Sequence, residues 1–217
     1  MTKVPPHQQN VFVGISLRNK TLTAQGVQRI LTLAREELGA RRLLFVLADE
    51  LELINLRVME KGTEEGFRKT ITEQARSLEA VIAQGVEGNA FPSMHVHVAR
   101  WRDILNAQYW ALYTEVFARF VESSSFRADL EEIAISFAAR RGRSVTGTQL
   151  HHLAMYLIGE LPTLLGGVDL SSKRYRTMIY PSRGTEAIDE LAFALSSGKY
   201  GECVGCERVC TVRRMEL

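Results

Sequence analysis

The sequence contains no hydrophobic run as long as a membrane span, which takes about 20 mostly apolar residues. The first ten residues are polar and lack the apolar segment of a secretory signal. Cysteine is scarce as well, because the three cysteines, Cys203, Cys206 and Cys210, lie close together near the C-terminus. They leave the core without thiols and provide no disulfide framework. We therefore expect a cytoplasmic protein with no membrane partner.

The sequence also has little excess charge of either sign. Its 27 basic and 25 acidic residues give a net charge of +2, which is small for a protein that binds nucleic acid over its whole surface. We expect no DNA partner. Between Arg140 and Arg183, however, seven basic residues outnumber two acidic ones. This segment could bind a polyanion, or it could be an ordinary solvated surface.

The apolar pattern predicts the fold class. Residues 11–16 and 43–47 are short apolar runs without alternation, typical of strands that are covered on both faces. The segment between them has a helical apolar stripe that ends at Gly39, so a strand–helix–strand unit with parallel strands is expected. Further helices are expected over residues 49–84 (with a break near Gly62), 103–121, 124–141, 148–161 and 185–197, and further strands over 94–99 and 177–180.

These elements predict a single α/β domain that is Rossmann-like and spans residues 10–198. Its sheet is mostly parallel, helices cover both faces, and extra helices are inserted between the last strands. Residues 1–9 are expected to form a flexible N-terminus. Residues 199–217 form a cysteine-containing C-terminal tail without hydrophobic periodicity, so we expect this tail to add little to the core.

The most informative position is Ser16, at the end of the first predicted strand. Ligands of open parallel sheets bind at the carboxyl ends of strands, so Ser16 could be a nucleophile or a phosphate ligand. It does not belong to a G-x-S-x-G elbow, because Arg18 stands where that motif needs glycine. Phosphate-binding glycine motifs are also missing from the sequence. Judged by its position alone, Ser16 is better explained as an ordinary turn residue than as a catalyst.

Three later residues could contribute to the same chemistry. Tyr156 and Glu160 are four apart on a predicted helix, so they share a face and could hold a substrate ammonium group. Gly159 between them weakens the helix by about 1 kcal/mol, which suggests that another segment approaches the backbone there. Tyr180 precedes Pro181 at a strand end and could transfer a proton. The alternatives are a solvated glutamate and a tyrosine that only packs.

Taken together and in this order, these residues resemble the cyclodipeptide synthases, enzymes that join two aminoacyl-tRNAs into a cyclic dipeptide. The resemblance covers residues 10–197, and its carriers are Gly14-Ile15-Ser16, Asn19, the Tyr156–Glu160 pair and Tyr180. It implies a fold similar to the catalytic domain of class I tyrosyl- and tryptophanyl-tRNA synthetases, without ATP or any other cofactor. The sequence agrees, since it has neither an H-I-G-H nor a K-M-S-K-S signature.

The resemblance also implies roles for individual residues. Ser16 would carry aminoacyl and dipeptidyl esters, Tyr156 and Glu160 would hold the ammonium group, and Tyr180 would assist proton transfer. The pocket for the first side chain would comprise Phe12, Gly14, Trp101, Thr163 and Met178. The tRNA would contact Arg68, Lys69 and Arg76.

The family has two branches, and this chain carries marks of both. Asn19, a candidate substrate-binding residue, fits one branch, whereas Tyr180-Pro181 fits the other. We assign the chain to the Tyr-Pro branch and expect a monomer.

Two other functions remain open from the sequence. The chain could be a non-catalytic RNA- or nucleotide-binding Rossmann module that uses the basic segment from Arg140 to Arg183. The Cys203-x-x-Cys206-x-x-x-Cys210 spacing could instead bind zinc or an iron–sulfur cluster, although three ligands do not complete a standard set. We expect no bound metal.

Overall fold

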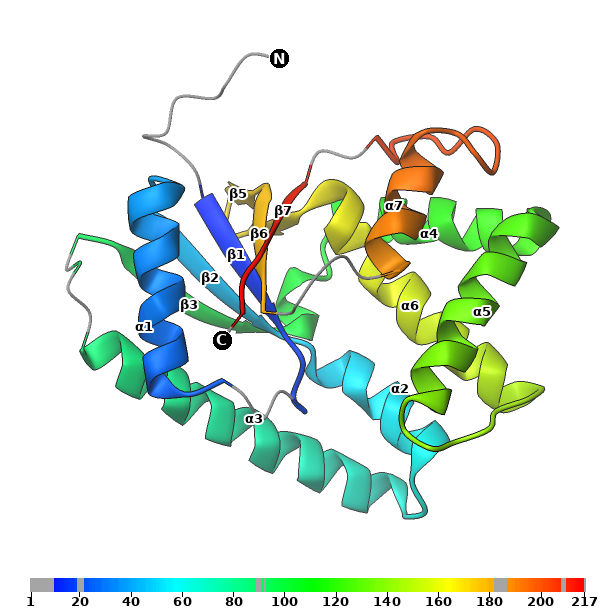
Figure 1. The fold of residues 1–217 in the computed structure, drawn as a ribbon, viewed down its shortest axis with the longest axis horizontal. Coiled ribbons are helices and arrows are strands. Elements are labelled where there is room, and N and C mark those ends of the chain that lie inside the picture. Colours follow the sequence, from blue (N-terminus) through cyan, green and yellow to red (C-terminus); the bar gives the residue numbers. More distant parts are fainter. Residues whose placement is uncertain are drawn as a thin grey trace.

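The computed structural model describes residues 10–18, 22–88, 91, 93–181, 187–207 and 210–216. Within these ranges, five parallel strands form one sheet in the order β3-β2-β1-β6-β7, and two antiparallel strands form a separate hairpin (Figure 1). The strands of the sheet are β1 (Asn10–Ile15), β2 (Arg42–Leu47), β3 (His95–Arg100), β6 (Thr177–Tyr180) and β7 (Thr211–Arg214). The hairpin consists of β4 (Val168–Leu170) and β5 (Lys173–Tyr175).

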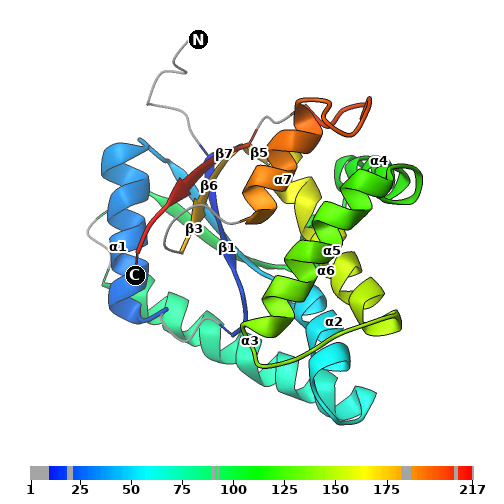
Figure 2. The same cartoon turned by 45° about the vertical axis from the view of Figure 1, so that its right-hand side comes forward.

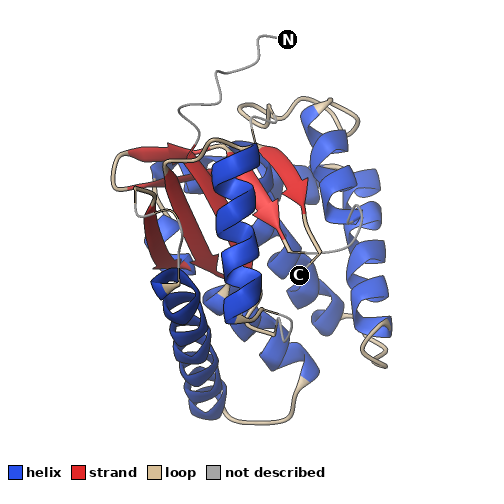
Figure 3. Cartoon of the chain, turned by 60° about the vertical axis from the view of Figure 1, so that its left-hand side comes forward, coloured by secondary structure: helices blue, strands red, loops and turns tan. Residues whose placement is uncertain are grey.

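Helices cover both faces of this sheet, as Figure 3 shows. One face carries α1 (Ala24–Thr32), continued by the π-helical segment η2 (Leu33–Glu37), and α3 (Glu64–Glu87). The other carries α4 (Ala107–Glu122), α5 (Ser124–Ala139), α6 (Thr148–Gly166) and α7 (Ala187–Ser196). Helix α2 (Asp49–Met59) contributes to both cores, and the short 3-10 helix η3 (Trp101–Ile104) follows β3. The predicted Rossmann-like α/β fold is confirmed.

Alternation along the central strands separates two hydrophobic cores. Val11, Val13 and Ile15 of β1 pack on the side of α1 and α3, whereas Phe12 packs on the side of α6. Both faces of β1 are covered by helices, so apolar residues do not alternate with polar ones along this strand, as the sequence pattern indicated. The central position of β1 fixes the place of Ser16, the residue that follows it.

The strand order also defines where a ligand can enter. From β1 the chain moves to β2 and β3 on one side, and later returns to β6 and β7 on the other. The order therefore reverses between β1 and β6, and such a switch point leaves a crevice at the carboxyl ends of the two strands. Ser16 follows β1 and Tyr180 ends β6, so both lie at this crevice.

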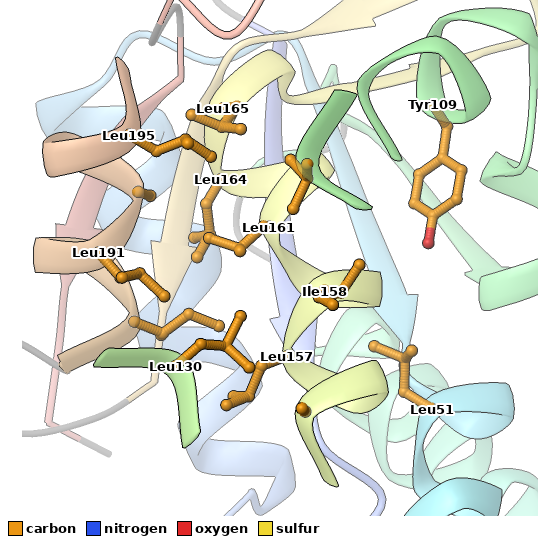
Figure 4. Packing of buried hydrophobic residues seen from close by; sticks show 14 of the residues in the cluster. Leu51, Tyr109, Leu130, Leu157, Ile158, Leu161, Leu164, Leu165, Leu191 and Leu195 are labelled. Atoms are coloured by element: carbon orange, nitrogen blue, oxygen red, sulfur yellow. The ribbon is translucent and has the colours of Figure 1, made fainter. Parts of the chain in front are cut away.

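Helix α6 is longer than the sequence predicted. It continues past Pro162 to Gly166, although proline lacks the N–H that would bind the carbonyl of Ile158. Burial on nearly all sides compensates: Leu157, Leu161 and Leu165 belong to the main core together with Leu191 of α7 (Figure 4). The helix ends at Gly167, whose φ of 72° suits glycine.

The segment after Gly198 is part of the folded domain. Strand β7 pairs in parallel with β6 and lies beside it in the sheet (Figure 2). Tyr200, Cys206 and Cys210 are buried in the main core. The expectation that this tail adds little to the core is therefore wrong. Its pairing is long-range, and a four-residue strand of sequence TVRR has no apolar run that would reveal it.

The cysteines differ from expectation as well. Cys203 and Cys206 form a disulfide, and Cys210 is a buried free thiol. The expected absence of a disulfide and of core thiols is wrong. The disulfide occupies two of the three thiols that a cysteine-ligated metal would need, and the described part of the chain holds no group of three His, Cys, Asp or Glu suited to a metal ion. None of its helices is long and apolar enough to cross a membrane.

Candidate active site

Ser16 lies at the carboxyl end of β1 and is half-buried. The residue before it, Ile15, accepts a hydrogen bond of 3.0 Å from the backbone N–H of Ala48, which follows β2. This bond ties the ends of the two central strands together. The backbone that presents Ser16 is therefore held by the sheet.

Tyr156 and Glu160 approach the same crevice from α6. Both are half-buried, one helical turn apart, and the Tyr156 ring stacks on Phe137 of α5 with ring centroids 6.0 Å apart. Burial raises the pKa of Tyr156 well above its usual range, and the negative charge of Glu160 raises this pKa further. Tyr156 therefore stays a neutral hydrogen-bonding group near neutral pH, beside a carboxylate.

A narrow cavity joins the predicted residues. Ser16, Tyr156, Glu160 and Tyr180 line a space of about 20 Å³, enough for roughly one water molecule. The same cavity is lined by all five residues of the predicted side-chain pocket, namely Phe12, Gly14, Trp101, Thr163 and Met178. Eight of these nine residues come from β1, η3, α6 and β6, and Ser16 directly follows β1, so the fold brings all nine together.

Met178 and Gly14 determine how small this cavity is. They lie on neighbouring strands, and a Cβ added to Gly14 would lie only 2.5 Å from the terminal methyl carbon of Met178. The methionine side chain therefore occupies the space beside the glycine. Because this side chain is unbranched and flexible, its movement would enlarge the cavity.

A larger groove of about 840 Å³ opens from the same four residues towards α5 and α7. Apolar side chains of α5, α6 and α7 line it, namely Ile133, Phe137, Leu157, Ile188 and Leu191. Arg141 lies at this groove with its guanidinium 3.6 Å from the centre of the Phe137 ring. The groove therefore combines an apolar wall with a cationic group and leads to Ser16.

The sequence did not identify a buried polar group at this groove. Glu52 of α2 is only 3% exposed, forms an ion pair with Arg18, and accepts a hydrogen bond of 3.1 Å from the side-chain amide of Asn55. Both Glu52 and Asn55 line the groove. The sequence holds a weak signal for them: a Glu and an Asn three residues apart share one face of a helix.

Two of the three predicted tRNA-binding residues lie together. Arg68 and Arg76 of α3 line a groove of about 410 Å³, where they are joined by Arg100 and Arg102 at the end of β3. Lys69 is exposed on the same helix but does not line this groove. Arg100 and Arg102 come from a distant part of the sequence, so helix periodicity could not associate them with α3.

This basic groove adjoins the narrow cavity. The Asp49 carboxylate accepts a hydrogen bond of 3.0 Å from the backbone N–H of Trp101 and lies 3.3 Å from the guanidinium of Arg100. Trp101 lines the narrow cavity and Arg100 lines the basic groove. The two sites are therefore neighbours at the carboxyl edge of the sheet.

The basic segment from Arg140 to Arg183 does not form one patch. Arg140, Arg141 and Arg143 precede α6, whereas Lys173, Arg174 and Arg176 follow it. A helix of 19 residues is about 28 Å long, so the two groups lie at its opposite ends. The six described basic residues of this segment therefore form two separate groups rather than one local patch. Asn19 and Arg183 lie outside the described residues.

Comparison with models of protein families identifies one family for this chain. The model of the family "Cyclodipeptide synthase" matches residues 3–195. The structure is similar to that of a cyclodipeptide synthase from Fluoribacter dumoffii, with a TM-score of 0.73 and 12% identity over 95% of this chain and 88% of that chain. No curated protein sequence matches this chain.

Two further solved structures extend the likeness. One is the Mycobacterium tuberculosis protein whose structure relates cyclodipeptide synthetases to type I tRNA synthetases, with a TM-score of 0.70 and 18% identity over 89% of this chain and 81% of that chain. The other is a tyrosyl-tRNA synthetase from Pyrococcus horikoshii, with a TM-score of 0.54 and 13% identity over 91% of this chain and 48% of that chain. At these identities, the likeness concerns the fold.

Proposed function

Because the chain belongs to the cyclodipeptide synthase family, we propose that it forms a cyclic dipeptide from two aminoacyl-tRNAs through ester intermediates on Ser16. The observation that carries this proposal is the meeting of Ser16, Tyr156, Glu160 and Tyr180 at one cavity. The four residues come from the ends of two strands and from one helix, at the switch point of the sheet.

The chemistry begins with an ester that is already activated, so it needs no ATP. The Ser16 hydroxyl oxygen attacks the carbonyl carbon of the first aminoacyl ester, and the ribose oxygen of the tRNA leaves with a proton. The product is an aminoacyl ester on Ser16. Such a covalent intermediate divides one difficult transfer into easier steps.

Two amine attacks complete the cycle. The amine of the Ser16-bound residue attacks the second aminoacyl ester, which releases the second tRNA and leaves a dipeptide on Ser16. The free amine of this dipeptide then attacks the Ser16 ester, closes the ring and returns the hydroxyl. Each attacking nitrogen must lose a proton. Glu160 is the carboxylate that lines the narrow cavity, where it can bind the ammonium group and accept its proton.

The narrow cavity supports selection of an apolar first residue. Phe12, Trp101 and Met178 give it apolar walls. The hydroxyl of Thr163 already donates a hydrogen bond of 2.8 Å to the carbonyl oxygen of Glu160, so its proton is not available to a substrate. We propose that these residues bind the side chain of the first amino acid.

The basic groove supports contact with tRNA phosphates. Arg68 and Arg76, our predicted contacts, share it with Arg100 and Arg102, and it lies beside the cavity that contains Ser16. Phosphate contacts of this kind make binding weaker as the salt concentration rises. We also propose Lys69 as a contact on the exposed side of α3, and membership of the Tyr-Pro branch from Tyr180-Pro181.

The test uses purified protein and a mixture of labelled aminoacyl-tRNAs. Mass spectrometry of the products and label retained on the protein are measured for the wild type and for Ser16→Ala. Ser197→Ala, at the exposed C-terminal end of α7, is the control. We expect cyclic dipeptide and labelled protein with the wild type and the control, and neither with Ser16→Ala.

Other outcomes contradict the proposal at different points. Equal ester label on Ser16→Ala would exclude Ser16 as the nucleophile. A wild-type protein that binds tRNA but releases no cyclic dipeptide from any aminoacyl-tRNA would instead favour the non-catalytic RNA-binding module.

A further inference from the structure

Strand β7 brings a second residue to Tyr180 from the far end of the chain. Parallel pairing places Tyr180 opposite Arg214, and the backbone N–H of Met215 donates a hydrogen bond of 3.2 Å to the carbonyl oxygen of Tyr180. Residues opposite each other in neighbouring strands point to the same face of the sheet. Arg214 and Tyr180 therefore share the face that carries the active site.

The Arg214 side chain covers the Tyr180 ring. Its guanidinium carbon lies 4.8 Å from the ring centroid, within the range of a cation–π interaction. The same guanidinium forms an ion pair with Asp189 of α7, and the side chains of Arg214 and Asp189 are only 15% and 7% exposed. A planar guanidinium can stack on a ring and bind a carboxylate at its edge, which an ammonium group does less well.

This arrangement restrains the phenol from two elements at once. Arg214 belongs to β7 and Asp189 to α7, whose neighbouring residue Ile188 lines the large groove. Tyr180 lines both the narrow cavity and that groove. The ion pair with Asp189 fixes the Arg214 guanidinium beside the Tyr180 ring.

We propose that Arg214 is a positioning residue that holds the Tyr180 phenol in its reactive orientation, so that the C-terminal strand completes the active site. The inference rests on the proposed function, because it requires Tyr180 to take part in the reaction. It assigns a role to a part of the chain that lies beyond the residues matched by the family model, which end at position 195.

The experiment compares two neighbouring arginines of β7. Arg214→Met keeps an unbranched apolar side chain but removes the charge, and Arg214→Lys restores the charge without the planar fork. Arg213→Met is the matched control, because Arg213 is exposed and lies on the opposite face of the same strand. Turnover and KM for aminoacyl-tRNA are measured for each variant, together with the thermal midpoint.

We expect Arg214→Met to lower kcat by about ten-fold or more while KM changes little, since a misplaced group costs rate rather than binding. Arg214→Lys should recover part of this loss, and Arg213→Met should behave as the wild type. If Arg214→Met does not fold, Arg214→Lys and Asp189→Asn provide the same comparison with the control.

A double-mutant cycle with Tyr180→Phe separates positioning from general stabilisation. If Arg214 acts through the phenol hydroxyl, Arg214→Met should have little further effect on kcat in the Tyr180→Phe background. An equal effect in both backgrounds, or a loss confined to KM, would overturn the inference. If Tyr180→Phe has no measurable turnover, the cycle cannot be completed. The role of Arg214 is then decided by whether Arg214→Met lowers kcat rather than raising KM, and by whether Arg213→Met behaves as the wild type.

Failure of this inference is distinct from failure of the proposed function. A wild-type protein without any cyclic dipeptide product would overturn the function. An active wild type in which Arg214→Met and Arg213→Met have the same kcat would overturn only the role of Arg214.

Discussion

The hydroxyl of Tyr109 donates a hydrogen bond of 2.8 Å to the carbonyl oxygen of Gly159, one residue before Glu160 in α6. A Cβ at Gly159 would lie 2.7 Å from a methyl carbon of Leu51, so α2 also reaches the helix here. Figure 4 shows Leu51 and Tyr109 on the Ile158 side of α6. The close approach expected from the glycine is confirmed, and it fixes the turn that carries Tyr156 and Glu160.

Replacing Tyr109 with phenylalanine should therefore destabilise the protein moderately. The change removes one buried hydrogen bond and keeps the ring, so the free energy of unfolding should fall by about 1 kcal/mol. Urea unfolding measures this loss. Tyr113→Phe is the control, because Tyr113 stacks on Tyr109 from the same helix but is only half-buried; a larger loss there would contradict the assignment.

The pH dependence of stability provides a second test of Tyr109. Burial raises the pKa of Tyr109 to about 12, compared with about 10 for an exposed tyrosine. Between these pH values the unfolded chain releases the phenol proton while the folded chain keeps it, so the free energy of unfolding falls as the pH rises. This contribution should be absent in Tyr109→Phe. The stability difference between the wild type and the variant should therefore shrink between about pH 10 and pH 12; a growing difference would contradict the raised pKa.

Glu160→Gln tests the charge at the active site. Glutamine preserves the shape and the ability to form hydrogen bonds but cannot pair with an ammonium group, a difference of roughly 1.5–3 kcal/mol for a charge-assisted bond. Turnover should fall by about ten-fold or more, while the thermal midpoint changes little. Glu190→Gln is the matched control, because Glu190 is an exposed carboxylate on α7 that lines the same groove. Similar losses in both variants would show that only the general negative charge of the groove matters.

Gly14 and Met178 should control which first amino acid is accepted. Gly14→Ala forces the Met178 methyl group away from its present position, since the new Cβ would lie 2.5 Å from it. Met178→Ala removes the same obstruction without adding a group. We expect products with larger first residues from Met178→Ala and slower formation of all products from Gly14→Ala. Competition among aminoacyl-tRNAs, followed by mass spectrometry, measures the product distribution; an unchanged distribution in Met178→Ala would remove this residue from the pocket.

Local patterns predicted much of the fold and of the candidate site. The buried strands around Val13 and Phe45, the four-residue spacing of Tyr156 and Glu160, and the strand end at Tyr180 are all visible within short windows of sequence. The structure brings these residues to one cavity because parallel strands end at the same edge of the sheet. Their catalytic roles remain predictions.

Features that depend on distant pairing were not predictable in this way. The β4–β5 hairpin has strands of three residues, and its turn places Ser171 and Ser172 at positive φ without a glycine to signal it. Arg100 and Arg102 meet Arg68 only because β3 ends beside α3. Arg214 reaches Tyr180 only through the pairing of β7 with β6.

Removal of residues 199–217 tests the most consequential of these distant pairings. The truncated chain would lose β7, the buried side chains of Tyr200, Cys206 and Cys210, and the contact of Arg214 with Tyr180. Burial of one large side chain alone contributes about 1.5–3 kcal/mol, so the free energy of unfolding should fall by several kcal/mol. Cyclic dipeptide formation should be lost.

A shorter truncation after Arg214 is the control: it keeps β7 and the stacking on Tyr180, and should retain most of the activity. Urea unfolding and product analysis of both truncations are the measurements. Full activity of the chain that ends at Gly198 would show that β7 is dispensable, and would contradict the role of Arg214 at the same time.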